Sequence, residues 1–399
     1  MRCIWITNLA LLTVRAIHTI KTRTELPTND HLRQTSFLIG HAETDHDIAL
    51  SVFYQLFAYR TMESRSSSPL SDAPSDITDY HLPVEVGERL NGYVPDGAQD
   101  DTKSFLETTF QFLPKDGKKN LEADIRGCQS DAELRTLANH IDTALIRPLK
   151  TVGGRTKPVT PSPRYGTEHS VEDLASQIQD SAVREQKQLR KEGLARDNNR
   201  CVLTNQLNED LPSPSQPELV GKLIAAHIIP FSMGSFASED GRYELAAMWQ
   251  SLYRYFPGVR ERLSASTINN ISNVMMLEDT IHIAFGTLNI ALEPLPESNK
   301  YRIFQTYTGN KIRYFTSLLP SDGIVTLVSH DPRYPLPDRT LLETHYLVAR
   351  ILHATGRGEV VEKILREYSE TGGMSSDGTT DISQMLSVTS LGPLLHGCA

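Results

Sequence analysis

Two histidines and an asparagine, each placed beside an apolar run, constrain the fold of this chain more than any other feature. His227 lies in the apolar run 223–229, which has the length and composition of a buried strand. Asn273 opens a second apolar run at 274–277, and His282 follows nine positions after the asparagine. Polar residues before the second histidine can cap a helix that carries it. The order therefore predicts a ββα unit with one polar side chain from each element.

These side chains are of the types that phosphodiester hydrolysis requires. The reaction needs an activated water in line with the leaving oxygen and positive charge at the phosphate. A neutral imidazole can take the proton of that water near pH 7, so we expect His227 to be the general base, oriented by Asn273. His282 is the expected metal ligand. Because Mg²⁺ prefers oxygen ligands, either Asp279 or Glu278 joins it, or Mn²⁺, Zn²⁺ or Ni²⁺ binds more weakly, or the site is empty. We expect the imidazoles and the amide to converge on one solvent-accessible cleft.

Three pieces of the sequence share the pattern of a known family. They are Arg196-Asp197-x-x-Arg200-Cys201-Val202-Leu203-Thr204, Ala225-Ala226-His227-Ile228-Ile229-Pro230-Phe231 and Asn273-Val-Met-Met-Leu-x-x-x-x-His282-x-x-Phe285. With these pieces, residues 196–310 resemble the HNH endonuclease domain of a large group of fungal proteins. The region from Leu336 to Gly356 resembles the helix that follows that domain, so the resemblance covers about half of the chain. It implies a ββα-metal core, a divalent metal ion (Mg²⁺, Mn²⁺ or Zn²⁺) and cleavage of nucleic acid, with DNA favoured over RNA.

Several positions depart from the pattern of that family. Many HNH sites have a carboxylate or a histidine directly before the general base, where this chain has Ala226. Family members often have acidic residues two positions before and four after the helix histidine, where this chain has Thr280 and Gly286. These departures leave open a catalytically silent HNH module that binds nucleic acid or a protein partner. A third hypothesis is a role without nuclease activity, in which the N-terminal helical region recognises a protein partner.

The acidic balance of the chain limits how it can bind nucleic acid. Its 40 lysines and arginines against 49 aspartates and glutamates give a formal net charge of −9, the wrong sign for a protein that coats nucleic acid. A local basic path can still bind phosphates beside the site. The predicted contacts on and after a charged helix at 171–195 are Arg190, Lys191, Arg196 and Arg200. The alternative is a solvated helix face, whose charges are balanced by Glu185, Glu192 and Asp197.

The remaining pattern predicts an α+β protein built from several segments. Two alternating runs, 289–295 and 301–307, predict an extra hairpin, and 245–256 predicts an inserted helix. A further helix is expected to begin at Asp338 and to stop at Gly356. The predicted segments are an N-terminal segment of uncertain role at 1–30, a helical region at 31–150, a Pro- and Gly-rich linker at 151–170, the HNH domain at 171–310, a C-terminal hairpin and helix extension at 311–369 and a disordered tail at 370–399.

Three helices are expected within the helical region. The first, at 45–61, has the apolar spacing of an amphipathic helix, and the second, at 103–113, ends before a proline. The third begins at Ser130, where Glu133 is placed to complete a capping box, and is expected to end before Pro148.

The cysteines and the N-terminus bear on the compartment. The four cysteines (Cys3, Cys128, Cys201 and Cys398) are far apart in the sequence, which argues for a reducing compartment and against a zinc cluster. No apolar run reaches the ~18 residues of a membrane span, so no membrane association is expected. Residues 1–24 contain basic but no acidic residues, which fits a secretory signal, a mitochondrial presequence or a buried element. We expect an intracellular protein of the nucleus or cytoplasm, with mitochondrial import as the alternative.

Overall fold

The computed structural model describes residues 81–150, 158–178, 185–212, 218–236, 238–307 and 309–357. The chain divides into two compact units, Met1–Ala73 and Pro74–Ala399, and all described residues belong to the second. The helix predicted at 45–61 and the segments predicted at 1–30 and 370–399 lie outside the described residues. No helix in the described part of the chain is long and apolar enough to cross a membrane.

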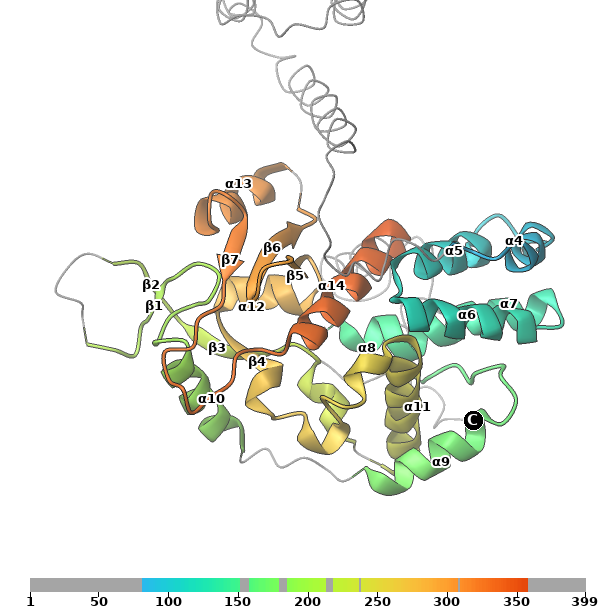
Figure 1. Ribbon diagram of the computed structural model, residues 1–399, viewed down its shortest axis with the longest axis horizontal. Helices are drawn as coiled ribbons and strands as arrows, with labels where there is room; N and C mark the ends of the chain where they lie inside the picture. The colour runs from blue at the N-terminus through green and yellow to red at the C-terminus, as the bar shows by residue number, and fades with distance from the viewer. Residues whose placement is uncertain are drawn as a thin grey trace, which may run out of the picture. The chain divides into compact units, whose positions relative to one another are not determined.

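The first described part of the chain is helical, as the sequence predicts (blue to green in Figure 1). The helix expected at 103–113 is present as α5, and it stops before Pro114, which is the N-cap of the next helix. The elements of this part are α4 (Val84–Asn91), α5 (Thr102–Phe112), α6 (Lys115–Gly127), α7 (Asp131–Ile141), the π-helical segment η1 (Asp142–Ile146) and α8 (Arg147–Leu149).

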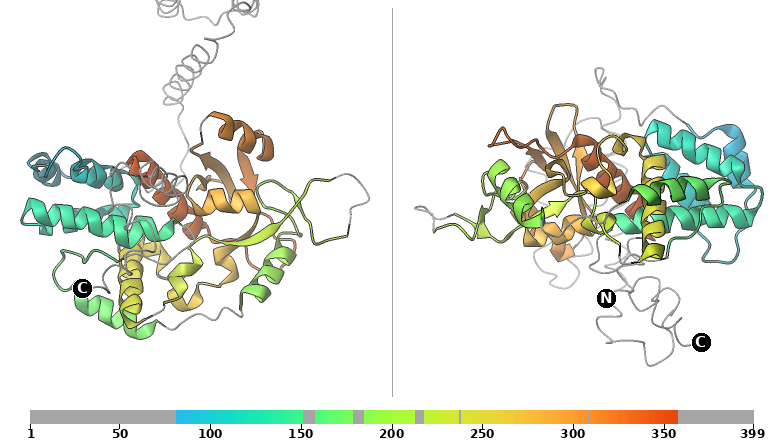
Figure 2. Two further views of the ribbon diagram at one scale, coloured as in Figure 1. Left: turned by 180° about the vertical axis from the view of Figure 1, so that it is seen from behind. Right: turned by 90° about the horizontal axis from the view of Figure 1, so that it is seen from below.

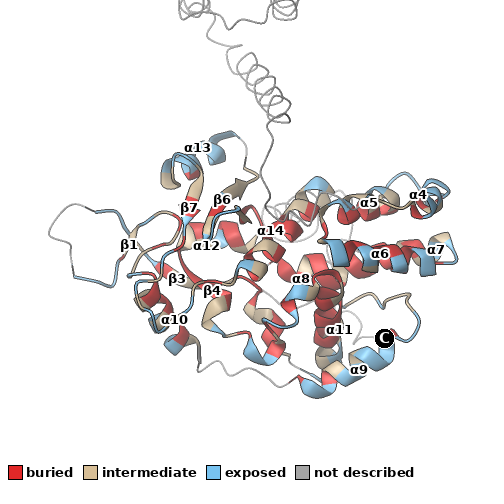
Figure 3. Cartoon of the chain, viewed as in Figure 1, coloured by how far each residue is buried: buried red, intermediate tan, exposed pale blue. Residues whose placement is uncertain are grey.

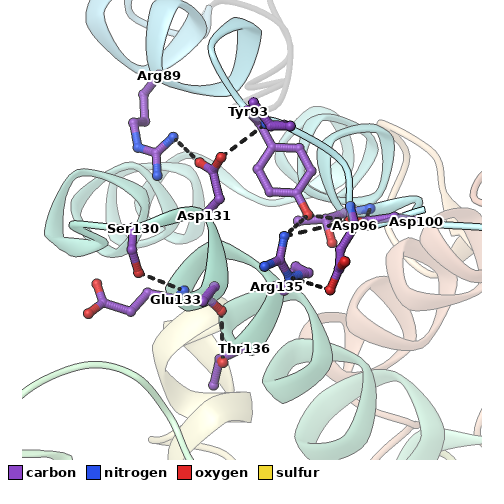
Figure 4. A network of polar contacts seen from close by, with 12 residues as sticks. Arg89, Tyr93, Asp96, Asp100, Ser130, Asp131, Glu133, Arg135 and Thr136 are labelled. Carbon is purple, nitrogen blue, oxygen red and sulfur yellow. Dashed lines mark hydrogen bonds and ion pairs between the residues drawn. The ribbon is translucent and has the colours of Figure 1, made fainter. Parts of the chain in front are cut away.

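The N-terminus of α7 is capped much as the sequence predicts. The Ser130 hydroxyl accepts from the backbone N–H of Glu133 at 3.2 Å. The Glu133 carboxylate accepts from the backbone N–H of Gln129 at 2.6 Å, one residue earlier than in a standard capping box. Asp131 then accepts from Arg89 of α4 at 2.8 Å, so the cap also joins two helices (Figure 4).

The expected helix end before Pro148 is wrong. Pro148 lies inside α8, and the π-helical segment η1 precedes it directly. A proline removes a backbone donor and its ring crowds the carbonyl four residues earlier. The wider π-helical turn accommodates this loss, so the helix continues to Leu149.

Two antiparallel strands and the helices around them hold the histidines and the asparagine. Strand β3 (Leu223–His227) pairs with β4 (Val274–Glu278), and His227 is opposite Val274. Helix α12 (Asp279–Gly286) follows β4 directly, so the predicted order of strand, strand and helix is present. The helix predicted at 171–195 is instead two helices, α9 (Thr167–Gln177) and α10 (Glu185–Arg196). Strands β1 (Leu207–Asn208) and β2 (Val220–Gly221) form a short parallel pair nearby.

A second sheet lies beside α12 and α14, with the predicted hairpin as its main part. Strands β5 (Ile290–Pro294) and β6 (Lys300–Gln305) are antiparallel, and β7 (Ile324–Thr326) adds a third strand that sequence patterning missed. Helix α13 (Gly309–Leu318) lies between β6 and β7 in the chain, and α14 (Arg339–Ala354) packs on β5. Asp338 caps α14 by accepting from two backbone N–H groups, and Gly356 follows its end with φ +70°. Both predicted ends of α14 are therefore confirmed.

Helix α11 (Glu239–Tyr255) joins these parts into one core. It is the predicted inserted helix, it begins earlier than expected, and it is buried along most of its length from Leu245 onward (Figure 3). It packs against α9, α6 and η1. A Cβ at Gly117 of α6 would lie 2.1 Å from the Tyr255 carbonyl oxygen, so this crossing requires a glycine. The helices before residue 150 thus share one hydrophobic core with the strands, across the predicted linker.

Within the described residues, four short 3₁₀ segments connect α11 and the strands. The segment that follows β3 (η2) contacts the one at 265–267 (η4), and the segment before β4 (η5) ends at Asn273. They are η2 (Phe231–Gly234), η3 (Pro257–Val259), η4 (Ala265–Thr267) and η5 (Ile271–Asn273).

A buried ion pair fixes the end of α10 against these elements. Arg196 has no exposed surface, and its Nε and Nη2 donate to the Asp197 carboxylate at 2.7 and 2.9 Å. Its other N–H groups donate to the carbonyl oxygens of Ile271, Val274 and Pro335. All five guanidinium donors therefore have acceptors.

Replacing Arg196 is expected to lower the free energy of unfolding of the protein. Arg196→Met leaves the Asp197 carboxylate buried without its cation, which costs about 3–5 kcal/mol of unfolding free energy. Urea unfolding measures this loss. The double variant Arg196→Met/Asp197→Leu should lose less, because no charge stays buried. A loss below about 1 kcal/mol in the single variant would contradict the structural role.

Candidate functional site

Asn273 fixes the chain that follows His227. The backbone N–H of Ile228 donates to the Asn273 carbonyl at 2.8 Å, which continues the β3–β4 ladder by one bond. The Asn273 side chain accepts from the Ile229 N–H at 2.9 Å and donates to the Ile229 and Ile268 carbonyls at 3.0 and 2.9 Å. It has no exposed surface. The expectation that Asn273 opens on a shared cleft is therefore wrong, because its amide is used entirely inside the fold.

Asn269 is the direct partner of His227. The His227 Nε2 lies 3.0 Å from the Asn269 Oδ1. An amide oxygen only accepts hydrogen bonds, so the Nε2 of a neutral imidazole carries the proton in this contact and Nδ1 keeps the lone pair. Asn269 is not predicted from the sequence, because the sequence does not distinguish it from the adjacent Asn270, which caps η5.

The two histidines of the pattern are close enough to interact electrostatically. Burial lowers the pKa of His227, the contact with Asn269 opposes this, and positive charge on His282 lowers the pKa of His227 further. Burial also lowers the pKa of His282, while the Asp279 carboxylate opposes that shift. Both shifts favour the neutral imidazole, the form that accepts a proton or binds a metal. Both side chains are partly exposed.

The first turn of α12 decides which carboxylate can accompany His282. Glu278 is the N-cap, and its carboxylate accepts from the backbone N–H groups of Thr280 and Ile281 at 3.0 and 3.2 Å. It is therefore used as a cap. Asp279 lies three residues before His282 on the same helix and acts on its pKa, so it is the carboxylate nearer to the imidazole.

The donors present bear on the predicted metal ion. In the described part of the chain, no group of three or more His, Cys, Asp or Glu side chains is arranged to hold a metal. His282 and Asp279 are two side chains that could hold an ion together with substrate phosphate and water. Ala226 has no exposed surface and pairs with Met275. A metal-ligating side chain at position 226 would therefore begin inside the hydrophobic core.

The four basic residues predicted to bind phosphate have different environments. Arg190 and Arg200 form surface ion pairs with Asp210 and Glu218, at 2.9 and 2.6 Å. Lys191 is exposed on α10. Arg196 is fully buried with all its donors used, so it is placed to support the fold and not to reach a phosphate.

His345 of α14 packs against Phe285 of α12. Its ring stacks on Phe285 with centroids 3.8 Å apart, and its Nε2 lies 3.2 Å from the Phe285 carbonyl oxygen. Burial lowers the pKa of His345 to about 3. The ring is thus neutral in the fold and acts as a packing group under the helix that carries His282.

Comparison with known proteins gives a family match for the segment that contains His227 and His282. Residues 201–293 match a family model described as HNH endonuclease. The matched segment contains His227, Asn269, Asn273 and His282. No curated protein and no solved structure matches the chain. The HNH match indicates nuclease or nucleic-acid-binding activity for this segment.

The pKa of His227 is expected to depend on His282. His282→Gln removes the imidazole whose protonation opposes that of His227, so the pKa of His227 should rise toward its ordinary value of about 6.5. NMR titration of the imidazole resonances measures the shift. His140, which is buried elsewhere against Thr160 and Ser251, should titrate unchanged. An unchanged pKa of His227 would show that the two rings do not interact.

Proposed function

We propose that the HNH segment hydrolyses phosphodiester bonds in nucleic acid, with DNA favoured over RNA. The observation that carries this proposal is the pairing of His227 with Asn269, next to His282 at the start of α12. A partly exposed neutral imidazole with a fixed orientation is what a general base requires. The match of residues 201–293 to an HNH endonuclease model supports the same chemistry.

In this mechanism His227 takes the proton of the attacking water. Asn269 holds Nε2–H, so Nδ1 is the atom that accepts the proton. When His227 becomes positively charged, the Asn269 oxygen stabilises it by the same hydrogen bond. Asn273 keeps Ile228 and Ile229 in place behind the base. Asn269 and Asn273 are therefore positioning residues.

The proposed cofactor is a divalent metal ion, Mg²⁺, Mn²⁺ or Zn²⁺, held by His282 and Asp279 together with the substrate phosphate. Its chemical contribution would be positive charge against the phosphate as the bond to the leaving oxygen breaks. Two protein donors predict weak metal binding in the absence of nucleic acid. Arg190, Lys191 and Arg200 are the proposed contacts to flanking phosphates, because they are at the surface.

Loss of the base should abolish cleavage without loss of binding. His227→Ala is expected to lower the rate of DNA cleavage by about 10²- to 10⁴-fold, because it removes only the proton acceptor. Plasmid nicking with each metal in turn measures the rate, and gel shift measures binding. His330→Ala, at an exposed histidine, is the matched control and should cleave like the wild type. Equal cleavage by both variants and the wild type would refute the assignment.

A catalytically silent HNH module is the second candidate. The buried Ala226 and the two-donor set of His282 and Asp279 favour it, because both leave fewer metal ligands than hydrolysis ordinarily uses. Such a module would bind nucleic acid or a protein partner. The same nicking assay separates the candidates, since the wild type would then bind DNA without cleaving it under any of the three metals.

Binding should depend on salt through the residues at the surface of α10. Arg190→Gln/Lys191→Gln should weaken DNA binding and flatten its dependence on the logarithm of salt concentration by about one unit for each phosphate that is no longer neutralised. Fluorescence anisotropy across a salt series measures the slope. Lys103→Gln/Lys119→Gln removes the same charge from α5 and α6 and should leave the slope unchanged. Equal slopes in the two double variants would favour a merely solvated face on α10.

A further inference from the structure

Helices α9 and α11 line an open cavity of about 880 Å³, together with residues of the stretch from η3 to η4. The two helices lie side by side in both views of this region (Figures 1 and 2). The cavity volume falls in the range of small-molecule sites. Its charged lining residues are Arg164, Asp173, Arg254 and Arg260.

Two arginines that line the cavity, Arg164 and Arg254, face one carboxylate. Arg254 donates to both oxygens of the buried Asp124, at 2.7 and 2.5 Å, and Tyr255 donates to it at 2.9 Å. Arg164 lies 3.9 Å from the same carboxylate. Because Asp124 is already paired with Arg254, the charge of Arg164 is only partly compensated. Burial and the positive charge of Arg254 both lower the pKa of Arg164, which shows how close the two cations lie.

A third arginine, Arg260, adds positive charge to the lining of the cavity. The Arg260 guanidinium lies 5.1 Å from the centre of the Tyr253 ring, which holds it against α11. No carboxylate in the described part of the chain lies within ion-pair distance of Arg260. Three guanidiniums around this cavity therefore face two carboxylates, Asp124 and Asp173. This local excess is positive in a chain whose net charge is −9.

The wall of the cavity is continuous with the HNH site. Ser264 and Ser266 line the cavity, and the same loop continues to Asn269, the partner of His227. Trp249, on the α11 wall, donates to the Met233 carbonyl at 2.7 Å, in the η2 segment that follows His227. The cavity and the base are thus joined by η2 and η4, which contact each other.

We propose that this cavity binds a phosphate group, with Arg164 and Arg260 as its ligands. Guanidinium groups form strong, charge-assisted hydrogen bonds to phosphate oxygens. The Ser264 and Ser266 hydroxyls, which lie 3.1 Å from each other, also line the cavity. Such a group comes from a free phosphate compound or from nucleic acid bound across the HNH site. The second source rests on the proposed function, whereas the site itself does not.

The site is tested first with inorganic phosphate and with adenosine monophosphate, by calorimetry on the full chain. Arg164→Gln/Arg260→Gln should weaken binding of both probes by about tenfold for each arginine removed. Asp173→Asn removes a repelling charge from the lining and should tighten binding by about twofold. The Asp173 variant does not touch the Asp124 network, so it tests the site even if the double variant is unstable. Arg313→Gln, on the exposed surface of α13, is the matched control and should bind like the wild type.

The source of the phosphate is tested with a DNA duplex and the same variants in a His227→Ala background. A parallel loss of DNA affinity in Arg164→Gln/Arg260→Gln assigns the site to nucleic acid flanking the base. Unchanged DNA affinity, with weakened binding of the small probes, assigns it to a free phosphate compound. Neither result depends on cleavage, so an inactive HNH segment would leave both intact. Equal affinity of the wild type and the double variant for inorganic phosphate would overturn the proposal.

Discussion

The guanidinium of Arg196 ties together the segments on which the candidate site depends. It ends α10, pairs with Asp197 and donates to carbonyls at η5, at the start of β4 and before α14. Asp197 in turn accepts from the backbone of Met276 inside β4. A charge buried this deeply is costly unless its donors are used, so these contacts hold the segments in the arrangement that supplies the acceptors. Because η5 ends at Asn273, the same pair also sets the position of the chain behind His227.

Two asparagines four residues apart have different tasks in this arrangement. Asn273 is wholly buried and holds the backbone after β3, whereas Asn269 is partly exposed and contacts the imidazole itself. The loop that carries Asn269 also forms a wall of the cavity between α9 and α11. A ligand that shifts this loop would therefore change the orientation of the base.

The helical region before residue 150 is part of the same folded body as the HNH segment. The close crossing of α6 and α11 at Gly117 joins them, as does the ion pair between Asp124 and Arg254, which are 130 positions apart in the sequence. The helices before residue 150 therefore have a structural role, because they form part of the surface on which α11 packs. It also explains how an acidic chain can hold two neighbouring arginines beside this cavity: Arg164 and Arg254 both face the buried carboxylate of Asp124 on α6.

The sequence by itself determined the strands around His227 and Asn273, the helix that carries His282, the β5–β6 hairpin and both ends of α14, because apolar periodicity and capping residues act locally. It did not reveal that Arg196 is buried while Arg190 and Arg200 are at the surface, or that Asn269 and not Asn270 contacts the imidazole. Those outcomes depend on which segments distant in the chain pack together. Only the tertiary structure decided them, because the burial of a side chain and the partner of a polar atom are set by neighbours that no local pattern encodes.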